Sequence, residues 1–182
     1  MRAVVIYESM YGNTRQIAEA IGSGLSGAFD VTVVPVSQAD PQMLADAGLV
    51  VAGGPTHVHG MSRASTRRSA VEAAGKPESG LKTEPGAAGT GLREWLGLLG
   101  RYQAKAAAFD TRMQGSALLT GRSSRQVARL LRAHGFDVAA PPESFLVTRQ
   151  NALVPDEPER AREWATKLAE SISPTRESRT SA

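Results

Sequence analysis

The sequence predicts an α/β domain built on a doubly wound, five-stranded parallel sheet. Short apolar runs alternate with amphipathic helical patterns along the chain, which is the pattern of strands joined by covering helices. The first run is apolar throughout and rich in β-branched residues, as in strands buried on both faces. The chain has 182 residues, 41% of them hydrophobic, which is enough for one domain with a full hydrophobic core.

The first half of the chain supplies three strands. A strand over residues 3–7 leads into a helix over residues 14–27, where Ile17, Ile21 and Leu25 recur four residues apart. A second strand follows over residues 31–36. Proline is favoured at the first helical position, so Asp40-Pro41 predicts a short helix to Leu44. The third strand, residues 49–52, ends at Gly53-Gly54-Pro55, and we expect a helix over residues 62–74.

The second half of the chain continues the alternation after a loop. Residues 75–91 contain five glycines and two prolines, which predicts a mobile loop within the domain. A short helix is expected over residues 92–99, a fourth strand over 105–109 and a helix over 123–134, which Gly135 ends. Residues 136–139 and 145–148 flank Pro141-Pro142 as an interrupted fifth strand. A final helix over residues 158–172 ends the domain, 1–172, and the polar residues 173–182 predict a disordered tail.

The predicted topology indicates where a ligand binds. With the strand order 2-1-3-4-5, the order reverses between strands one and three. Doubly wound sheets bind ligands beyond the carboxyl ends of their strands at such a point. We therefore expect the ligand site in the loops over residues 8–14, 53–61 and 110–116.

The loop after the first strand suits an anion. It lies at the N-terminus of the first predicted helix, where backbone amides and the helix dipole favour negative charge. The loop contains neither of the glycine-rich patterns of dinucleotide-binding folds and P-loops. The spacing alone is equally compatible with an ordinary strand–helix turn in which Thr14 is the N-cap. The candidate residues are Ser9, Met10, Tyr11, Gly12, Asn13 and Thr14.

Two motifs resemble a known family. The run V-I-Y-E-S-M-Y-G-N-T-R-Q-I-A-E-A-I is similar to the FMN phosphate loop of flavodoxins, which carries a hydroxyl, then Gly-x-Thr, then a helix with a buried alanine. The S-M-Y-G portion also resembles the quinone-reductase branch of flavodoxin-like proteins, the tryptophan-repressor-binding-protein family. A second loop of that branch reads roughly Gly-x-Pro-Thr, and residues 53–61 (GGPTHVHGM) resemble it. Residues on the first pattern are Ser9, Gly12, Thr14, Ala18 and Ile21.

The resemblance implies a flavodoxin-like fold that binds FMN and transfers one or two electrons. Its flavin ring is expected between the 56–60 and 111–115 loops, neither of which contains Trp, Tyr or Phe. We therefore predict hydrogen bonds from backbone amides, Thr56 and Thr111 in place of aromatic stacking. Beyond the phosphate loop, the implied cofactor-binding residues are Pro55, Thr56, His57, Val58, His59, Gly60, Thr111, Arg112 and Met113.

Three functions remain compatible with these residues. An electron carrier, which exchanges electrons with a redox partner protein, requires the fewest assumptions. An FMN-dependent quinone reductase would oxidise NAD(P)H and reduce a small acceptor, and Arg63, Arg67 and Arg68 follow the flavin loop as candidate contacts for the dinucleotide phosphates. The third function is a flavin-binding sensor without turnover.

Composition excludes several other classes. The chain has no cysteine, which rules out disulfides, thiolate nucleophiles and Cys-ligated iron–sulfur clusters. No apolar run reaches the roughly 20 residues of a membrane span, and no secretory signal pattern is present, so a cytoplasmic protein is expected. The net charge of +3 is mixed along the chain without an aromatic platform, so no nucleic-acid partner is predicted. His57 and His59 lack the neighbouring carboxylates that would favour a metal site.

Overall fold

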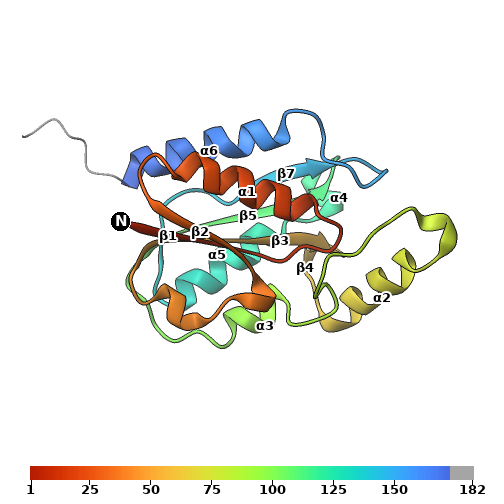
Figure 1. Cartoon of the computed structure of the whole chain (residues 1–182), viewed down its shortest axis with the longest axis horizontal. Helices are drawn as coiled ribbons and strands as arrows, with labels where there is room; N and C mark the ends of the chain where they lie inside the picture. Colours follow the sequence, from red (N-terminus) through yellow and green to blue (C-terminus); the bar gives the residue numbers. More distant parts are fainter. Residues whose placement is uncertain (173–182) are drawn as a thin grey trace, which may run out of the picture.

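The computed structural model describes residues 1–172, and the predicted tail lies outside them (Figure 1). The helices are α1 (Asn13–Leu25), α2 (Ala64–Ala74), α3 (Leu92–Leu96), α4 (Ala117–Thr120), α5 (Ser123–Ala133) and α6 (Glu157–Ile172). Short 3₁₀ turns are η1 (Val36–Gln38), η2 (Pro41–Leu44) and η3 (Pro77–Ser79). The strands are β1 (Arg2–Tyr7), β2 (Asp30–Pro35), β3 (Ala47–His57), β4 (Gly60–Met61), β5 (Lys105–Met113), β6 (Asp137–Val138) and β7 (Glu143–Val147).

The main sheet is parallel, in the order β2-β1-β3-β5-β6. β7 also pairs with β5, so β6 and β7 are two parts of an interrupted fifth strand. β4 instead forms a short antiparallel hairpin with the end of β3. The predicted doubly wound α/β fold and its order 2-1-3-4-5 are therefore confirmed. None of the helices between residues 1 and 172 is long and apolar enough to cross a membrane.

Helices cover both faces of the sheet and bury two cores (Figure 1). Side chains alternate along each strand, so β1 contributes Val4 and Ile6 to one core and Ala3 and Val5 to the other. α3 and α5 cover the first core, and α1 and α6 cover the second. Both faces must be apolar, which is why the strands read as continuous hydrophobic runs.

Contact between α1 and α6 depends on a glycine. A Cβ atom at Gly24 would lie 2.3 Å from the carbonyl oxygen of Arg162 and 2.9 Å from the side chain of Ala165. The Thr166 hydroxyl donates to the Gly24 carbonyl at 3.3 Å. A side chain at position 24 would therefore push apart the two helices that cover one face of the sheet.

Two predicted strands are longer in the structure than in the sequence-based prediction. β3 continues through residues 53–57 and β5 through residues 110–113, which were expected to be loops. Gly53, Gly54 and Pro55 suggest a turn, yet they pair in register with Phe109, Asp110 and Thr111. A Cβ atom at Gly53 would lie 2.4 Å from the Phe109 ring, so this glycine serves close packing and not a turn.

Other boundaries were also misjudged. The first part of the fifth strand was expected over residues 136–139 but contains only Asp137–Val138, and α3 ends at Leu96 and not at residue 99. The helix expected over residues 62–74 begins at Ala64. The helix α4 was not predicted, because four residues are too few to show helical periodicity.

Candidate functional site

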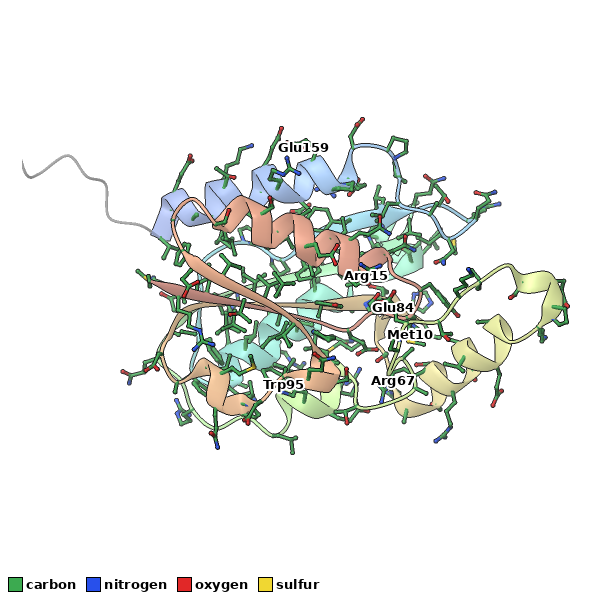
Figure 2. All side chains as sticks on the ribbon, in the orientation of Figure 1. Met10, Arg15, Arg67, Glu84, Trp95 and Glu159 are labelled. Carbon is green, nitrogen blue, oxygen red and sulfur yellow. The ribbon has the colours of Figure 1, made fainter. Side chains whose placement is uncertain are left out.

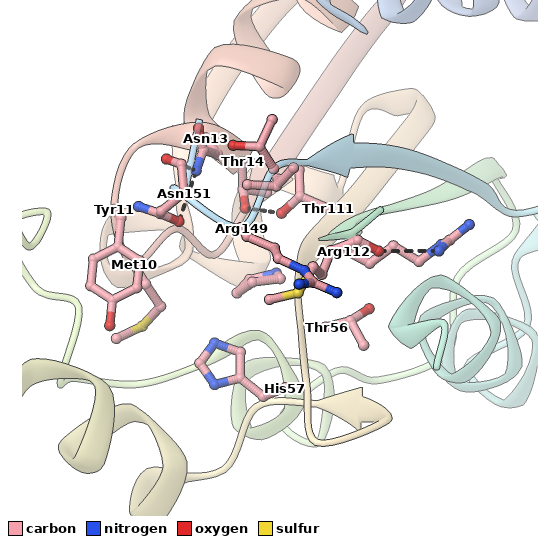
Figure 3. Close-up of a pocket in the computed structure, with 14 residues that line it drawn as sticks. Met10, Tyr11, Asn13, Thr14, Thr56, His57, Thr111, Arg112, Arg149 and Asn151 are labelled. Atoms are coloured by element: carbon pink, nitrogen blue, oxygen red, sulfur yellow. Dashed lines mark hydrogen bonds between the residues drawn. The ribbon is translucent and has the colours of Figure 1, made fainter. Parts of the chain in front are cut away.

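A pocket lies at the carboxyl edge of the sheet, where β1, β3, β5 and β7 end (Figure 3). It includes the point where the strand order reverses, as the topology predicted. One side is the start of α1, and the opposite side is formed by the ends of β3 and β5. The lining residues are Met10, Tyr11, Asn13, Thr14, Pro55, Thr56, His57, Thr111, Arg112, Met113, Val147, Thr148, Arg149 and Asn151.

The N-terminus of α1 opens toward this pocket without a side-chain cap among residues 1–172. Gly12 precedes the helix in the left-handed region, with a φ of 94° that glycine adopts without strain. The first intrahelical bond runs from the Gln16 amide to the Gly12 carbonyl, so the amides of the first turn have no acceptor inside the helix. Thr14 lies inside α1, and the alternative that it is the N-cap was wrong.

Buried hydrogen bonds fix the shape of this loop. The Gly12 amide donates to Ser9 Oγ at 3.2 Å, and the hydroxyls of Thr14 and Thr111 lie 2.7 Å apart (Figure 3). Ser9, Thr14 and Thr111 are all buried. The first bond shapes the turn, and the second joins α1 to β5 across the floor of the pocket.

Asn13 connects the loop to the segment after β7. Its side-chain amide donates to both the carbonyl oxygen and Oδ1 of Asn151 at 3.1 Å (Figure 3). Asn151 has a φ of 58°, a conformation that asparagine tolerates better than most residues. This contact brings Arg149 over the pocket from the same segment.

The glycine-rich segment between α2 and α3 packs against the loop over residues 8–14. The Glu84 amide donates to the Met10 carbonyl at 2.8 Å, and the Glu84 carboxylate pairs with Arg15 Nε at 3.0 Å (Figure 2). Within this glycine-rich segment, η3 forms one turn of regular structure. These contacts connect residues 75–91, which the composition predicted to be a mobile loop, to the start of α1.

The other end of the pocket is built from strand ends and exposed loops. Val58 and His59, at the tip of the β3–β4 hairpin, have φ values of 44° and 71°, which are unfavourable for side chains with a Cβ atom. His57 lines the pocket, and burial lowers the pKa of its imidazole below the ordinary value. Arg112 donates to the Gly115 carbonyl and the Thr120 hydroxyl, both at 2.9 Å, and so holds the loop after β5.

A buried carboxylate positions α5 behind the pocket. Asp110 on β5 is fully buried, and its Oδ2 accepts from the Ser124 amide at 2.7 Å. The Thr56 hydroxyl accepts from the adjacent Ser123 amide at 2.9 Å. The two strand ends thereby satisfy the first amides of α5. Burial raises the pKa of Asp110 because the charged form loses solvation.

The pocket contains ten of the fifteen predicted cofactor residues. Ser9 and Gly12 shape the loop before α1 without lining the pocket, and Val58, His59 and Gly60 form the hairpin beyond it. Prediction missed Val147, Thr148, Arg149 and Asn151. Val147 ends the fifth strand and the other three residues follow it. This strand neighbours the fourth, so the segment after the fifth strand could have been included among the candidate loops.

Arg67 was proposed as a dinucleotide contact, and the structure contradicts this assignment. Its side chain is 3% exposed and pairs with Glu94 at 3.2 Å. The guanidinium also donates to Ser62 Oγ and to the Gly89 carbonyl, both at 3.0 Å (Figure 2). Arg67 therefore holds α2 against the segment before α3, while Arg63 and Arg68 remain exposed.

Comparison with known proteins identifies the family. Residues 5–117, more than half of the chain, match the family model described as flavodoxin. The chain belongs to the flavodoxin family. The match covers the end of β1, the loop over residues 8–14, β3 and β5, which build most of the pocket. Searching curated proteins finds no match.

Solved flavodoxins share this fold over nearly their whole length. A flavodoxin from the domain Archaea aligns with 94% of this chain and 99% of its own, at 19% identity and a TM-score of 0.64. Oxidised flavodoxin 1 from Bacillus cereus aligns over 95% and 100%, at 14% identity and a TM-score of 0.66. The flavodiiron protein from Giardia intestinalis matches 94% of this chain with only 36% of its own, at 18% identity and a TM-score of 0.59. These likenesses establish a flavodoxin-like fold.

Proposed function

We propose that this flavodoxin-family chain binds FMN in the pocket and acts as an electron carrier. Bound FMN would supply one- and two-electron redox chemistry that the cysteine-free chain lacks. The observation that carries the proposal is the uncapped N-terminus of α1, which opens into a pocket at the point where the strand order reverses.

The phosphate of FMN fits the α1 end of the pocket. A dianion there would accept hydrogen bonds from first-turn amides and would be stabilised by the helix dipole. Gly12 lets the loop turn tightly at this point, and the bonds of Ser9 and Thr14 hold the loop in place before a ligand arrives. Arg149, which lines the same pocket, would supply the positive charge that the loop itself lacks.

The flavin ring fits the opposite end. Residues 55–57 and 111–113 form two walls, and the buried Nε atom of Arg112 has no hydrogen-bond partner among residues 1–172. A ring carbonyl would accept from such a donor, because a buried unpaired N–H carries a free-energy cost. Tyr11 adds an aromatic ring to the lining, with its hydroxyl fixed to the Ala70 carbonyl at 2.9 Å.

Comparing FMN with riboflavin tests the phosphate assignment. The two ligands share the ring and differ in the phosphate, so the Ser9→Ala/Thr14→Ala variant should weaken FMN binding by at least tenfold and riboflavin binding much less. Met113→Ala, at the ring end, is the matched control and should affect both ligands equally. Titrations followed by flavin fluorescence measure both affinities. Equal losses for the two ligands in the Ser9/Thr14 variant would show that the loop is only structural.

Steady-state kinetics separate the carrier from a reductase. Arg67 is not available to a dinucleotide phosphate, which favours the carrier. FMN-loaded protein should oxidise NADH or NADPH with benzoquinone no faster than free FMN does. Turnover of about 1 per second or more would establish the reductase. A protein that binds FMN but exchanges electrons with no redox protein would be the sensor.

A further inference from the structure

Four large apolar side chains are exposed beside the pocket. Val58 is 82% exposed, Met113 51%, Leu118 89% and Leu119 72%, and together they form what we name the apolar rim. Exposed apolar residues are ordinary when scattered, but a cluster of them marks an interaction site. Val58 lies at the tip of the β3–β4 hairpin, Met113 ends β5, and Leu118 and Leu119 lie in α4, all at the carboxyl edge of the sheet.

The β3–β4 hairpin and α4, which carry three of these side chains, lie against each other. His59 forms a β-bridge with Gly121, which joins the tip of the β3–β4 hairpin to the end of α4. A second hollow lies on this junction, and Leu118, His59 and Arg125 line it. Val58 lies between His57, which lines the flavin pocket, and His59, which lines the second hollow.

The surface around the apolar rim is rich in arginine. Residues 53–71 and 111–136 contain no aspartate or glutamate. Their exposed arginines are Arg63, Arg68, Arg125, Arg129 and Arg132.

Three of these arginines form an exposed stripe on α5. Arg125, Arg129 and Arg132 recur at spacings of four and three residues, which places them on one side of the helix. None of the three forms a salt bridge within residues 1–172, whereas Arg15, Arg160 and Arg162 on α1 and α6 all do. The stripe leads along α5 to the apolar rim, because Arg125 and Leu118 line the same hollow.

We propose that the apolar rim and the arginine stripe of α5 form the docking surface for an acidic redox partner protein. The inference rests on the proposed function, because FMN in the pocket would lie beside the rim. Apolar contacts would hold the two proteins at the flavin edge, and the arginines would attract carboxylates and accelerate the encounter. Methionine and arginine are also enriched in protein interfaces.

A plant-type [2Fe–2S] ferredoxin with an acidic surface is a suitable probe. One electron leaves its reduced cluster, which is oxidised, and enters FMN on this chain, which is reduced. Stopped-flow absorbance gives the second-order rate constant of this step. For the native sequence, the rate constant should fall steeply as salt rises from about 20 to 500 mM, because screening weakens attraction between opposite charges.

Three double variants test which residues form the docking surface. Arg125→Glu/Arg129→Glu should slow the reaction by about tenfold or more at low salt and remove its salt dependence. Leu118→Ser/Leu119→Ser should slow it at every salt concentration while keeping that dependence. Arg162→Glu/Lys167→Glu changes the net charge equally on α6, which covers the opposite face of the sheet, and should have a small effect. The three variants are at exposed positions outside the flavin pocket and should keep FMN affinity.

Several results would overturn the docking surface. One is a rate that does not change, or that rises, with salt in the native sequence; another is an equal loss in the α6 variant. Binding to phosphatidylserine vesicles that is lost in the α5 variant, with an unchanged ferredoxin rate, would assign the stripe to an anionic membrane. Failure of the native sequence to bind FMN would refute the proposed function, whereas FMN binding with a salt-insensitive rate would refute the docking surface alone.

Discussion

The two ends of the pocket are built in opposite ways. At the α1 end, the loop is buried and held by short hydrogen bonds, such as the 2.7 Å contact between Thr14 and Thr111. At the hairpin end, Val58 and His59 adopt unfavourable backbone conformations and Val58 is 82% exposed. The first end is preorganised for a small charged group, while the second presents apolar surface to the solvent. Under our two proposals, the α1 end binds the cofactor and the hairpin end contacts the partner.

Gly12→Ala should have the largest effect on stability, because an alanine side chain strains the backbone at the α1 end of the pocket. A φ of 94° is unfavourable for alanine, and the new Cβ atom would lie 3.3 Å from the Glu84 carboxylate. We expect the free energy of unfolding to fall by about 2 kcal/mol, as measured by urea unfolding. Gly27→Ala is the matched control, because a Cβ atom at Gly27 meets nothing within 4 Å. Similar losses in both variants would show that a side chain at position 12 does not strain the loop before α1.

Thr111→Val tests whether buried hydroxyls hold the α1 end. The substitution leaves the Thr14 hydroxyl buried without its partner, which should cost about 1–2 kcal/mol of unfolding free energy. Thr14→Val/Thr111→Val removes both hydroxyls and should cost less than the sum of the single substitutions. Additive losses in this double-mutant cycle would mean that the two side chains do not interact.

Val58→Gly should stabilise the protein slightly, whereas Gly12→Ala should destabilise it. Glycine relieves the strain of a β-branched residue at a φ of 44°, although it also increases the freedom of the unfolded chain. Few contacts are lost, because the side chain is exposed. Unfolding in urea should show a gain of about 0.5 kcal/mol. A loss of that size would indicate that Val58 packs against its neighbours in solution.

The imidazole of His57 should give the hairpin end a small pH dependence. Burial lowers its pKa from the ordinary 6.5, so the unfolded chain takes up a proton at a higher pH than the folded chain. The free energy of unfolding should therefore decline as the pH falls from about 6.5 toward the folded pKa, and His57→Asn should reduce this decline. Urea midpoints of the FMN-free protein between pH 7.5 and 5.5 give the comparison. If the urea midpoints of the native sequence and of His57→Asn change equally with pH, His57 has the same pKa in the folded and unfolded chains.

The sequence predicts the α1 end of the pocket better than the hairpin end. Ser9, Gly12 and Thr14 stand in a local pattern between a strand and a helix, so adjacent residues alone indicate their role. The alternation of strands and helices predicts a doubly wound sheet, and the expected order 2-1-3-4-5 was confirmed.

Local sequence patterns could not predict the contacts between segments that are distant along the chain. Asn13 contacts Asn151, 138 residues away, and Glu84 lies against Gly12 although its loop composition indicates mobility. The continuation of β3 through Gly53, Gly54 and Pro55 depends on pairing with β5, which overrides the preference of these residues for turns.

We propose that the start of α1 holds the FMN phosphate as a dianion. Phosphorus NMR of the FMN-loaded protein tests it directly, because the second pKa of a phosphate monoester is about 6. Amides and the helix dipole stabilise the dianion, so the bound phosphorus resonance should keep its position from pH 8 to pH 5. A resonance that shifts with a midpoint near pH 6, as for free FMN, would contradict the claim.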